Sequence, residues 1–362
     1  MAVVVRVFTD IQSIQHDWWT LARQVGSHFL HYPCWYQAQL LAYPVAEQVF
    51  FVGVYDNHGL AAVIPLQATQ LKVKSVSIPG LTLFYPNEMG VADITTRIPL
   101  APVRPLIYRQ LRRQGAKFWF IKYHSLLASS HCLASGLFST ADVCKPSHTS
   151  KYLSIADGEE NFYQHRNKKL RRNIRQKQGY ANQTGELQVK SITTPEKLPE
   201  AYRIFLDLEA SGWKGEQNSS IQQQSNKRHY YDHLFAGYSQ EQQLIINLLY
   251  VGEHCIAGQF GVLCGRTLYL LKIAYDEDYS HLSPGYLLIH ELITDDQRCY
   301  DKLSFVTGIS WADRWYPEID QVWVGYDFTR AWLNRLGRRL LDVKNRRQKP
   351  VATATDSVPA EE

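Results

Sequence analysis

Residues 267–293 read TLYLLKIAYDEDYSHLSPGYLLIHELI, and this stretch decides the fold. It starts with an apolar run typical of a buried strand, continues through a short polar loop, and ends in an apolar helix opened by Ser283, Pro284 and Gly285. The first N–H groups of a helix have no partner inside the helix, and the helix dipole makes that end attractive to anions. Gly285 would let a ligand approach the backbone closely. The stretch therefore predicts a strand, an anion-binding loop and a helix in that order, with the loop from Asp278 to Gly285 as the phosphate site.

The Ser-Pro pair also has a plainer interpretation. Ser283 could cap the helix by accepting hydrogen bonds from its first N–H groups, and proline is favoured in the first turn. The residues that follow favour a site, because the helix leads into a second apolar run, Lys302 to Val306, and then into a polar turn at Gly308. Strand, loop, helix, strand and polar turn thus occur in sequence.

Upstream of this stretch, the chain contains the same hairpin pattern twice. Residues 49–66 and residues 243–262 each read as two strands joined by a tight turn, with a pair of small residues directly after the turn. The spacing of roughly 195 residues indicates a duplicated domain rather than a short repeat, although two unrelated hairpins would give the same pattern.

Composition limits the class of protein. The chain has 362 residues, of which 45% are hydrophobic and 20% charged, values typical of a globular protein of two domains. No apolar run approaches the ~20 residues that span a bilayer. The first eight residues include Arg6 and lack the apolar core of a signal peptide. We therefore expect a cytoplasmic protein without a transmembrane helix.

Cysteine and charge patterns narrow the chemistry further. The six cysteines are scattered, with no C-x-x-C pair and no zinc-like spacing, so reduced thiols and no metal are expected. The net charge of +5 is concentrated, because seven cations and no acid lie between Arg166 and Lys177. This basic helix, 166–177, predicts one anionic contact: an acidic substrate, coenzyme A phosphates, anionic lipid or tRNA. A merely solvated helix face remains the alternative.

These motifs together resemble the GNAT superfamily of acyl-coenzyme A N-acyltransferases. The resemblance is to the tandem-domain CelD-like acetyltransferases of the cellulose-biosynthesis type and to the related Fem-type peptidyltransferases. It rests on four stretches between about residues 151 and 315: the basic segment 165–173, the segment 208–215, the strand-to-helix unit 275–285, and the strand that ends at Gly308. Family members commonly carry a Tyr-Lys pair shortly after the equivalent glycine, whereas this chain has residues 309–314, ISWADR, in that place.

The resemblance implies an α/β (α+β) fold of two tandem GNAT-like halves, each a mixed and mostly antiparallel sheet flanked by helices. We expect the N-terminal half at residues 1–150, the acyltransferase half at 151–344 and a disordered tail at 345–362. The implied activity is transfer of an acyl group, typically acetyl, from acyl-coenzyme A to an amine such as an amino sugar or sugar nucleotide in polysaccharide or envelope synthesis.

The implied chemistry assigns roles to particular residues. A base must take a proton from the acceptor ammonium, and backbone amides must hold the thioester carbonyl. The candidate bases are Glu209 and Asp313, and Tyr275 or Tyr279 would protonate the departing thiolate. The expected donor-binding residues are Ile273, Tyr279, Ser283 and Gly285. The expected acceptor-binding residues are Trp213, Lys214, Ser310 and Arg171.

Two other functions stay open from the sequence. A Fem-type transferase would take its acyl group from aminoacyl-tRNA, which the basic helix would suit. A non-catalytic GNAT-like protein would use the same helix to bind an acidic partner or membrane, and the absent Tyr-Lys pair keeps this possibility open.

Overall fold

The computed structural model describes residues 3–73, 75–84, 91–127, 129–138, 143–156, 158–164, 166, 168–211, 220–330, 332 and 335. The strands are β1 (Val4–Phe8), β2 (Val49–Asp56), β3 (Gly59–Val73), β4 (Val76–Leu83), β5 (Thr95–Thr96), β6 (Phe120–Leu127), β7 (Val143–Ser154), β8 (Leu187–Ile192), β9 (Leu244–Val251), β10 (His254–Cys264), β11 (Thr267–Tyr275), β12 (Lys302–Ser304) and β13 (Glu318–Phe328). The α-helices are α1 (Gln12–Val25), α2 (Pro33–Ala42), α3 (Arg104–Arg113), α4 (His131–Ala134), α5 (Gly158–Gln164), α6 (Lys168–Thr184), α7 (Leu198–Ser211), α9 (Ser225–Gln240) and α10 (Pro284–Thr294). Short 3₁₀ helices are η1 (Phe29–His31), η2 (Ala101–Val103), η3 (Glu277–Leu282) and η4 (Ser310–Trp315).

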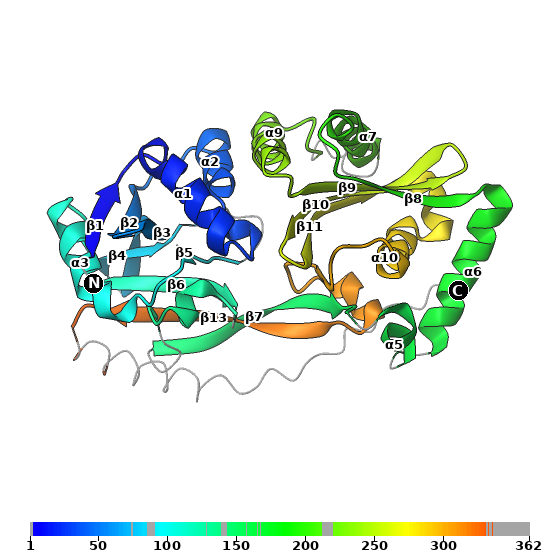
Figure 1. The fold of residues 1–362 in the computed structure, drawn as a ribbon. Coiled ribbons are helices and arrows are strands. Elements are labelled where there is room, and N and C mark those ends of the chain that lie inside the picture. The colour runs from blue at the N-terminus through cyan, green and yellow to red at the C-terminus, as the bar shows by residue number, and fades with distance from the viewer. Residues whose placement is uncertain are drawn as a thin grey trace.

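The strands form one sheet that runs through the whole molecule in the order β1-β2-β3-β4-β6-β13-β7-β12-β11-β10-β9-β8, with β5 paired to β3 (Figure 1). Each end of this sheet has the same plan: four antiparallel strands and then a fifth that is parallel to the fourth. In the described part of the chain, α1 and α2 lie between the first and second strands of one end and α7 and α9 between those of the other, and a helix precedes the fifth strand of each end. The mixed α/β fold expected from the sequence is confirmed, and the two ends repeat one element order.

The middle of the sheet joins the two ends covalently and through hydrogen bonds. Strand β7 pairs with β12 on one side and with β13 on the other, and β13 continues along β6. The expected boundary at residue 150 therefore falls inside a strand that belongs to the shared middle. The division into 1–150 and 151–344 as separate folding units stays a prediction.

Helices cover both faces of the sheet. On one face, α1 and α2 of the first part and α7 and α9 of the second enclose a single continuous apolar core. Helices α2 and α9 approach so closely that a Cβ atom on Gly237 would lie 2.3 Å from Cβ of Cys34. On the opposite face of the second part, α5, α6 and α10 pack over β9–β11 around a separate core. Figure 1 shows α7 and α9 on one side of β8–β11 and α10 on the other.

Some stretches divide differently from what their sequence suggests. The apolar stretch from Leu71 to Ile78 belongs to two antiparallel strands, β3 and β4, which pair from Leu71–Ile78 to Val73–Val76. The basic helix expected at 166–177 is α6, which begins at Lys168 and continues to Thr184. The tail 345–362 lies outside the described residues.

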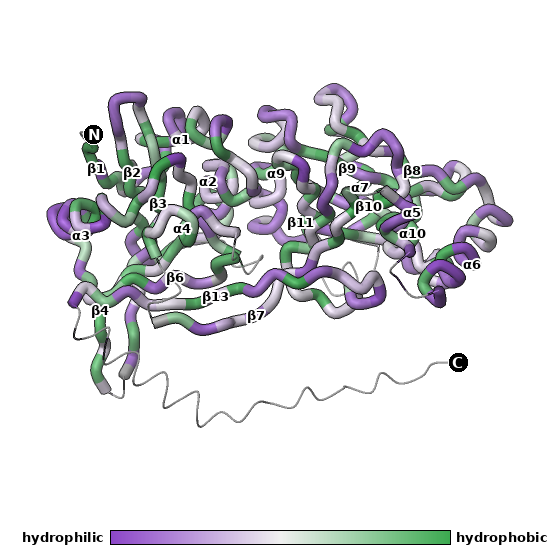
Figure 2. Tube along the Cα trace, turned by 60° about the horizontal axis from the view of Figure 1, so that its bottom comes forward, coloured by the Kyte–Doolittle hydropathy of each residue, from purple (hydrophilic) through white to green (hydrophobic). Residues whose placement is uncertain are grey.

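Hydropathy along the chain locates the polar surfaces. The tube in Figure 2 is strongly hydrophilic along α6, whereas the strands of the sheet are largely hydrophobic. Among the residues described, no helix has both the length and the apolar character needed to cross a bilayer.

Candidate donor-binding site

The site begins where two parallel strands diverge. Strand β11 pairs with β12 only over Thr267–Tyr269, opposite Lys302–Ser304. Within the described part of the chain, the rest of β11, Leu270–Tyr275, has no strand partner on the β12 side. The chain leaves β12 through Val306, which adopts a φ of 63°, a value unusual for a β-branched residue. The backbone of β11 is therefore accessible along an open edge.

A cavity of about 310 Å³ lies against this open edge. It is mostly apolar, and its floor is the second half of β11 with the first turn of α10 as one wall. Helix η4 closes it from the side of the polar turn after β12. The lining residues are Ile273, Tyr275, Ser280, Ser283, Pro284, Gly285, Tyr286, Trp311 and Arg314.

The start of α10 presents an N–H group to this space. Ser283 lies in the left-handed region, with φ 55° and ψ 59°, and its side chain makes no capping hydrogen bond. Instead its backbone carbonyl accepts from the N–H groups of Tyr286 and Leu287, at 2.9 and 3.1 Å. Pro284 has no N–H, and within the described residues no acceptor bonds the N–H of Gly285. The capping interpretation of Ser283 is therefore wrong, and the hydroxyl is left to line the cavity.

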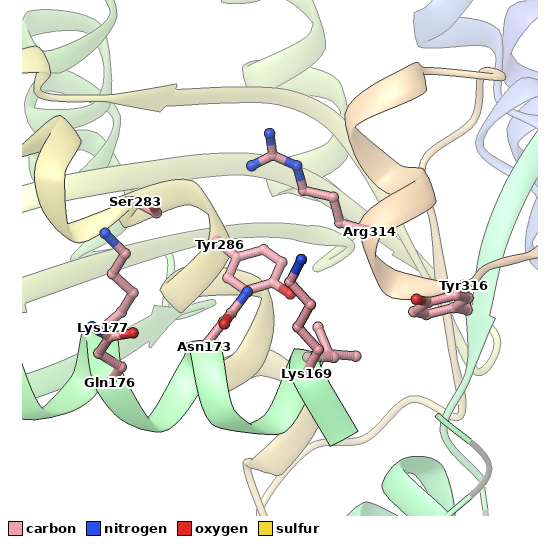
Figure 3. Close-up of a pocket in the computed structure, with 9 residues that line it drawn as sticks. Lys169, Asn173, Gln176, Lys177, Ser283, Tyr286, Arg314 and Tyr316 are labelled. Carbon is pink, nitrogen blue, oxygen red and sulfur yellow. The ribbon is translucent and has the colours of Figure 1, made fainter. Parts of the chain in front are cut away.

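A second cavity, of about 460 Å³, adjoins the first. Ser283, Tyr286 and Arg314 line both, so the two cavities meet at the start of α10. The remaining wall of the second cavity comes from α6 and from the residue that follows η4, as Figure 3 shows. Those lining residues are Lys169, Leu170, Asn173, Gln176, Lys177 and Tyr316.

The electrostatics at the junction favour an anion. Arg314 is exposed and makes no ion pair with an acid among the residues that the structure describes. Burial raises the pKa of Tyr286 to about 12, and the nearby Arg314 guanidinium opposes that rise. Among the residues that the structure describes, neither cavity has a carboxylate in its wall. The arrangement combines a helix N-terminus, a guanidinium and two lysines.

Four of the residues expected from the sequence come together here. Ile273, Tyr275, Ser283 and Gly285 all line the apolar cavity, and Tyr275 is 41% exposed. Trp213 and Lys214 lie outside the described residues. The sequence reading missed Arg314, Trp311 and Tyr286, although the first two stand in the quoted stretch 309–314.

The other expected residues line neither cavity. Glu209 is buried on α7, on the opposite face of the sheet, and its Oε2 atom accepts from the N–H of Ile221 at 2.7 Å. Tyr279 stacks on His281. Arg171 lies over the ring of Tyr163, 5.4 Å from its centroid. Their assigned roles stay predictions.

Asp313 and Ser310 are on η4, next to the cavities rather than in their walls. The Oδ1 atom of Asp313 lies 2.7 Å from Nζ of Lys151, which also donates to the carbonyl of Ile309 at 3.0 Å. The Lys151 side chain is largely buried, whereas that of Asp313 is 63% exposed. Asp313 thus has one fixed cationic partner and an open side toward solvent.

On α6 the residues that line the cavity do not include Arg171, the residue named from the sequence. Lys169, Asn173, Gln176 and Lys177 follow a spacing of four, three and one residues, which places them on one side of a helix. Lys169 and Arg171 lie on opposite flanks of the buried stripe formed by Leu170 and Ile174, so helical periodicity alone does not distinguish them.

Comparison with known proteins agrees with this geometry. Residues 168–315 match the family model described as an acetyltransferase (GNAT) domain. No curated protein sequence matches the chain.

Solved structures share the fold over nearly the whole chain. FemX superposes with a TM-score of 0.56 at 10% identity, covering 91% of this chain and 99% of FemX. The C-terminal domain of a putative lysylphosphatidylglycerol synthetase from Agrobacterium fabrum gives 0.52 at 10% identity, covering 92% of this chain and 95% of that domain. L-PGS from Bacillus licheniformis gives 0.51 at 12% identity, covering 92% and 97%.

The sequence match spans α6 to η4, which are the elements that build both cavities, while the structural likeness extends across both ends of the sheet. Residues 168–315 are therefore similar to a GNAT acetyltransferase domain, and the chain shares its overall fold with FemX.

Proposed function

We propose that the protein is an acyl-coenzyme A-dependent N-acyltransferase whose donor lies in the two cavities. The observation that carries the proposal is the opening between β11 and β12, with an apolar cavity on one side of the start of α10 and a cationic cavity on the other. Coenzyme A has the matching polarity, since its pantetheine arm is neutral and its nucleotide end is anionic.

The donor fits in one orientation. The diphosphate lies at the junction, where the N–H of Gly285 and the guanidinium of Arg314 can both donate to it. The pantetheine arm then follows the open edge of Leu270–Tyr275, so that its amides can pair with strand backbone as another strand would. The thioester would then lie beside β11.

The chemistry at that point requires a base, an electrophilic amide and an acid. The amine acceptor arrives as an ammonium ion and must lose a proton before it attacks the thioester carbonyl. A backbone N–H at the end of β11 would stabilise the developing oxyanion, and the Tyr275 hydroxyl would protonate the thiolate. Asp313 and Glu209 remain the proposed bases. An amino sugar or sugar nucleotide of polysaccharide or envelope synthesis is the proposed acceptor.

An aminoacyl-tRNA donor is the second candidate, because three exposed cations of α6, Lys168, Arg172 and Arg175, face solvent beside the cationic cavity. Purified protein is to be titrated with acetyl-coenzyme A and with aminoacyl-tRNA in parallel calorimetric runs. Thiol release is then followed on addition of amino sugars to the acetyl-coenzyme A sample. Binding of acetyl-coenzyme A with amine-dependent thiol release supports the proposal. Binding of aminoacyl-tRNA alone would replace it with the second candidate.

A further inference from the structure

Three segments of the first part meet at one end of the sheet. The N–H of Trp119, just before β6, donates to the carbonyl of Pro79 in β4 at 2.9 Å. The carbonyl of Trp119 accepts from the N–H of Thr329, just after β13, also at 2.9 Å. Because β4 is parallel to β6, the turn that joins β3 to β4 lies at the end where β6 begins. The β3–β4 turn, the segment before β6 and the segment after β13 are therefore neighbours.

These three segments carry only positive charge. Together they contain seven lysines and arginines and no aspartate or glutamate. The segments are residues 70–80, 112–119 and 329–335. Those of their cations that the structure describes, Lys72 and Lys117 among them, are all exposed. This end of the molecule therefore attracts anions.

The surroundings leave that charge in excess. One acid, Glu47, lines the same cavity as Lys117, and its Oε2 atom accepts from Nε2 of Gln67 at 3.1 Å. The sequence that continues from this end, residues 336–349, adds six cations and one acid. An anionic partner that covers this end would thus meet many more cations than acids.

Apolar side chains are exposed at the same place. Val76, at the β3–β4 turn, is 60% exposed, Trp119 is 43% exposed and Trp332 is 55% exposed. The guanidinium of Arg330 lies over the ring of Trp119, 5.3 Å from its centroid. Large apolar groups and cations are therefore interleaved on a surface that faces solvent.

We propose that this end of the molecule binds the surface of an anionic lipid bilayer. We call it the Trp119 surface, formed by Lys72, Val76, Lys117, Trp119, Arg330 and Trp332. Each lysine or arginine held near an anionic bilayer strengthens binding by about fivefold. Tryptophan rings are favoured at the level of the lipid headgroups, and apolar side chains beside cations enter the boundary between headgroups and acyl chains.

A nucleic acid would use the cations of the Trp119 surface but not its apolar groups. Unpaired bases stack on aromatic faces, whereas Arg330 already lies over the ring of Trp119. Val76 offers neither charge nor a hydrogen bond to a phosphate backbone. A bilayer takes up both kinds of side chain, which is why we favour lipid.

The Trp119 surface is separate from the two cavities. None of its six residues lines either of them. In Figure 1 the ends of β4, β6 and β13 near α3 lie far from α6 and α10. Lipid binding and acetyl-coenzyme A binding can therefore be measured independently on the same chain.

The first test removes charge. The full chain is sedimented with vesicles of phosphatidylcholine, with and without phosphatidylglycerol. We expect binding only to vesicles that contain phosphatidylglycerol, weakening as salt is added. Lys72→Gln/Lys117→Gln should bind these vesicles about 25-fold more weakly, at about fivefold for each cation. Arg172→Gln/Arg175→Gln, which removes two exposed cations from α6, should bind as wild type does.

The second test removes apolar contact at constant charge. Val76→Ser should weaken binding to phosphatidylglycerol vesicles by about fivefold and Trp119→Ser by about tenfold, because both side chains lose contact with the bilayer. Ile319→Ser is the matched control, since Ile319 is a β-branched residue of 61% exposure outside the Trp119 surface. It should bind as wild type does. Thermal unfolding and titration with acetyl-coenzyme A check that every variant is folded.

The remaining outcomes overturn the proposal. Wild type that stays in solution with phosphatidylglycerol vesicles excludes lipid binding, whatever its affinity for acetyl-coenzyme A. If Arg172→Gln/Arg175→Gln loses binding as fully as Lys72→Gln/Lys117→Gln, only the general charge of the chain acts. If single-stranded RNA displaces the protein from vesicles and Val76→Ser binds both as wild type does, the Trp119 surface is a nucleic-acid site instead.

Discussion

The Cδ1 atom of Ile273 lies 3.7 Å from the position that a Cβ atom on Gly285 would occupy, and no other atom outside the neighbouring residues is within 4 Å of it. Strand β11 and helix α10 are therefore one methyl group apart at the mouth of the apolar cavity. Gly285 has no positive φ, so neither backbone strain nor packing requires a glycine there. What the missing side chain provides is access to the backbone N–H from the cavity.

One donor should bind per chain, although the fold repeats. In the first part, β4 and β6 pair through Leu81 and Thr82, at the end of β4. No stretch of β4 comparable to Leu270–Tyr275 of β11 therefore follows the paired residues. Calorimetry should give a stoichiometry of one acetyl-coenzyme A per chain. Two sites of similar affinity would contradict this view of the first part.

Arg314→Gln should weaken both acetyl-coenzyme A and acetyl-dephospho-coenzyme A by a similar factor of about ten, because Arg314 stands where the diphosphate common to both ligands would lie. Titration of each ligand measures this factor, with Arg172→Gln as the control of equal charge. Unchanged affinity of Arg314→Gln for both ligands would show that Arg314 does not contact the diphosphate.

Asp313→Asn should lower kcat by about 10²–10⁴ if Asp313 is the base, with little change in acetyl-coenzyme A affinity. The reason is that Asp313 lies beside the cavities without lining them. Thermal unfolding of the variant controls for loss of its contact with Lys151. An active variant would leave Glu209, across the sheet, as the remaining proposed base.

Acid should destabilise the fold through His290. Burial lowers the pKa of this side chain from 6.5 to about 4, and its Nδ1 atom is hydrogen-bonded to the Tyr163 hydroxyl, 2.5 Å away. Below pH 6.5 the unfolded chain binds a proton that the folded chain binds only near pH 4. Stability therefore falls by up to about 3 kcal/mol as pH drops from 6.5 to 4 and levels off below.

Urea unfolding of wild type and His290→Asn at pH 7, 5.5 and 4 would measure that contribution. Burial also lowers the pKa values of His28 and His124, to about 3 and about 4, so the informative quantity is the difference between the two proteins. The free energy of unfolding should depend less on pH in His290→Asn. Parallel curves would show that His290 does not titrate in this range.

The sequence predicted those lining residues of the candidate site that lie in one contiguous segment of the chain. Ile273, Ser283 and Gly285 follow from one contiguous strand, loop and helix, whose geometry depends on near neighbours. Lys169 and Arg171 differ by about 200° around α6, and only the packing of Leu170 and Ile174 shows which of them faces the cavity. Clustered charge alone could not separate the two.

The pairing of strands that are far apart along the chain could not be predicted from the sequence. Strand β13 begins more than 150 residues after β7 ends, yet the two pair over Glu318–Tyr326 and connect the two ends of the sheet. No residue pattern within β7 or β13 indicates which strand it pairs with. The left-handed backbone of Ser283 and Tyr316 was equally hidden, because these residue types seldom adopt it.

The central claim is that acyl-coenzyme A binds at the start of α10, and calorimetric titration of acetyl-coenzyme A into wild type, Gly285→Ala and Gly285→Val tests it most directly. Alanine places a methyl group at ordinary contact distance from Ile273, whereas the two methyl groups of valine extend into the space around the N–H of Gly285. We expect wild type to bind, Gly285→Ala to bind more weakly, and Gly285→Val to lose binding while unfolding at the wild-type temperature. Absence of binding to wild type, or equal binding to wild type and Gly285→Val, would contradict the account.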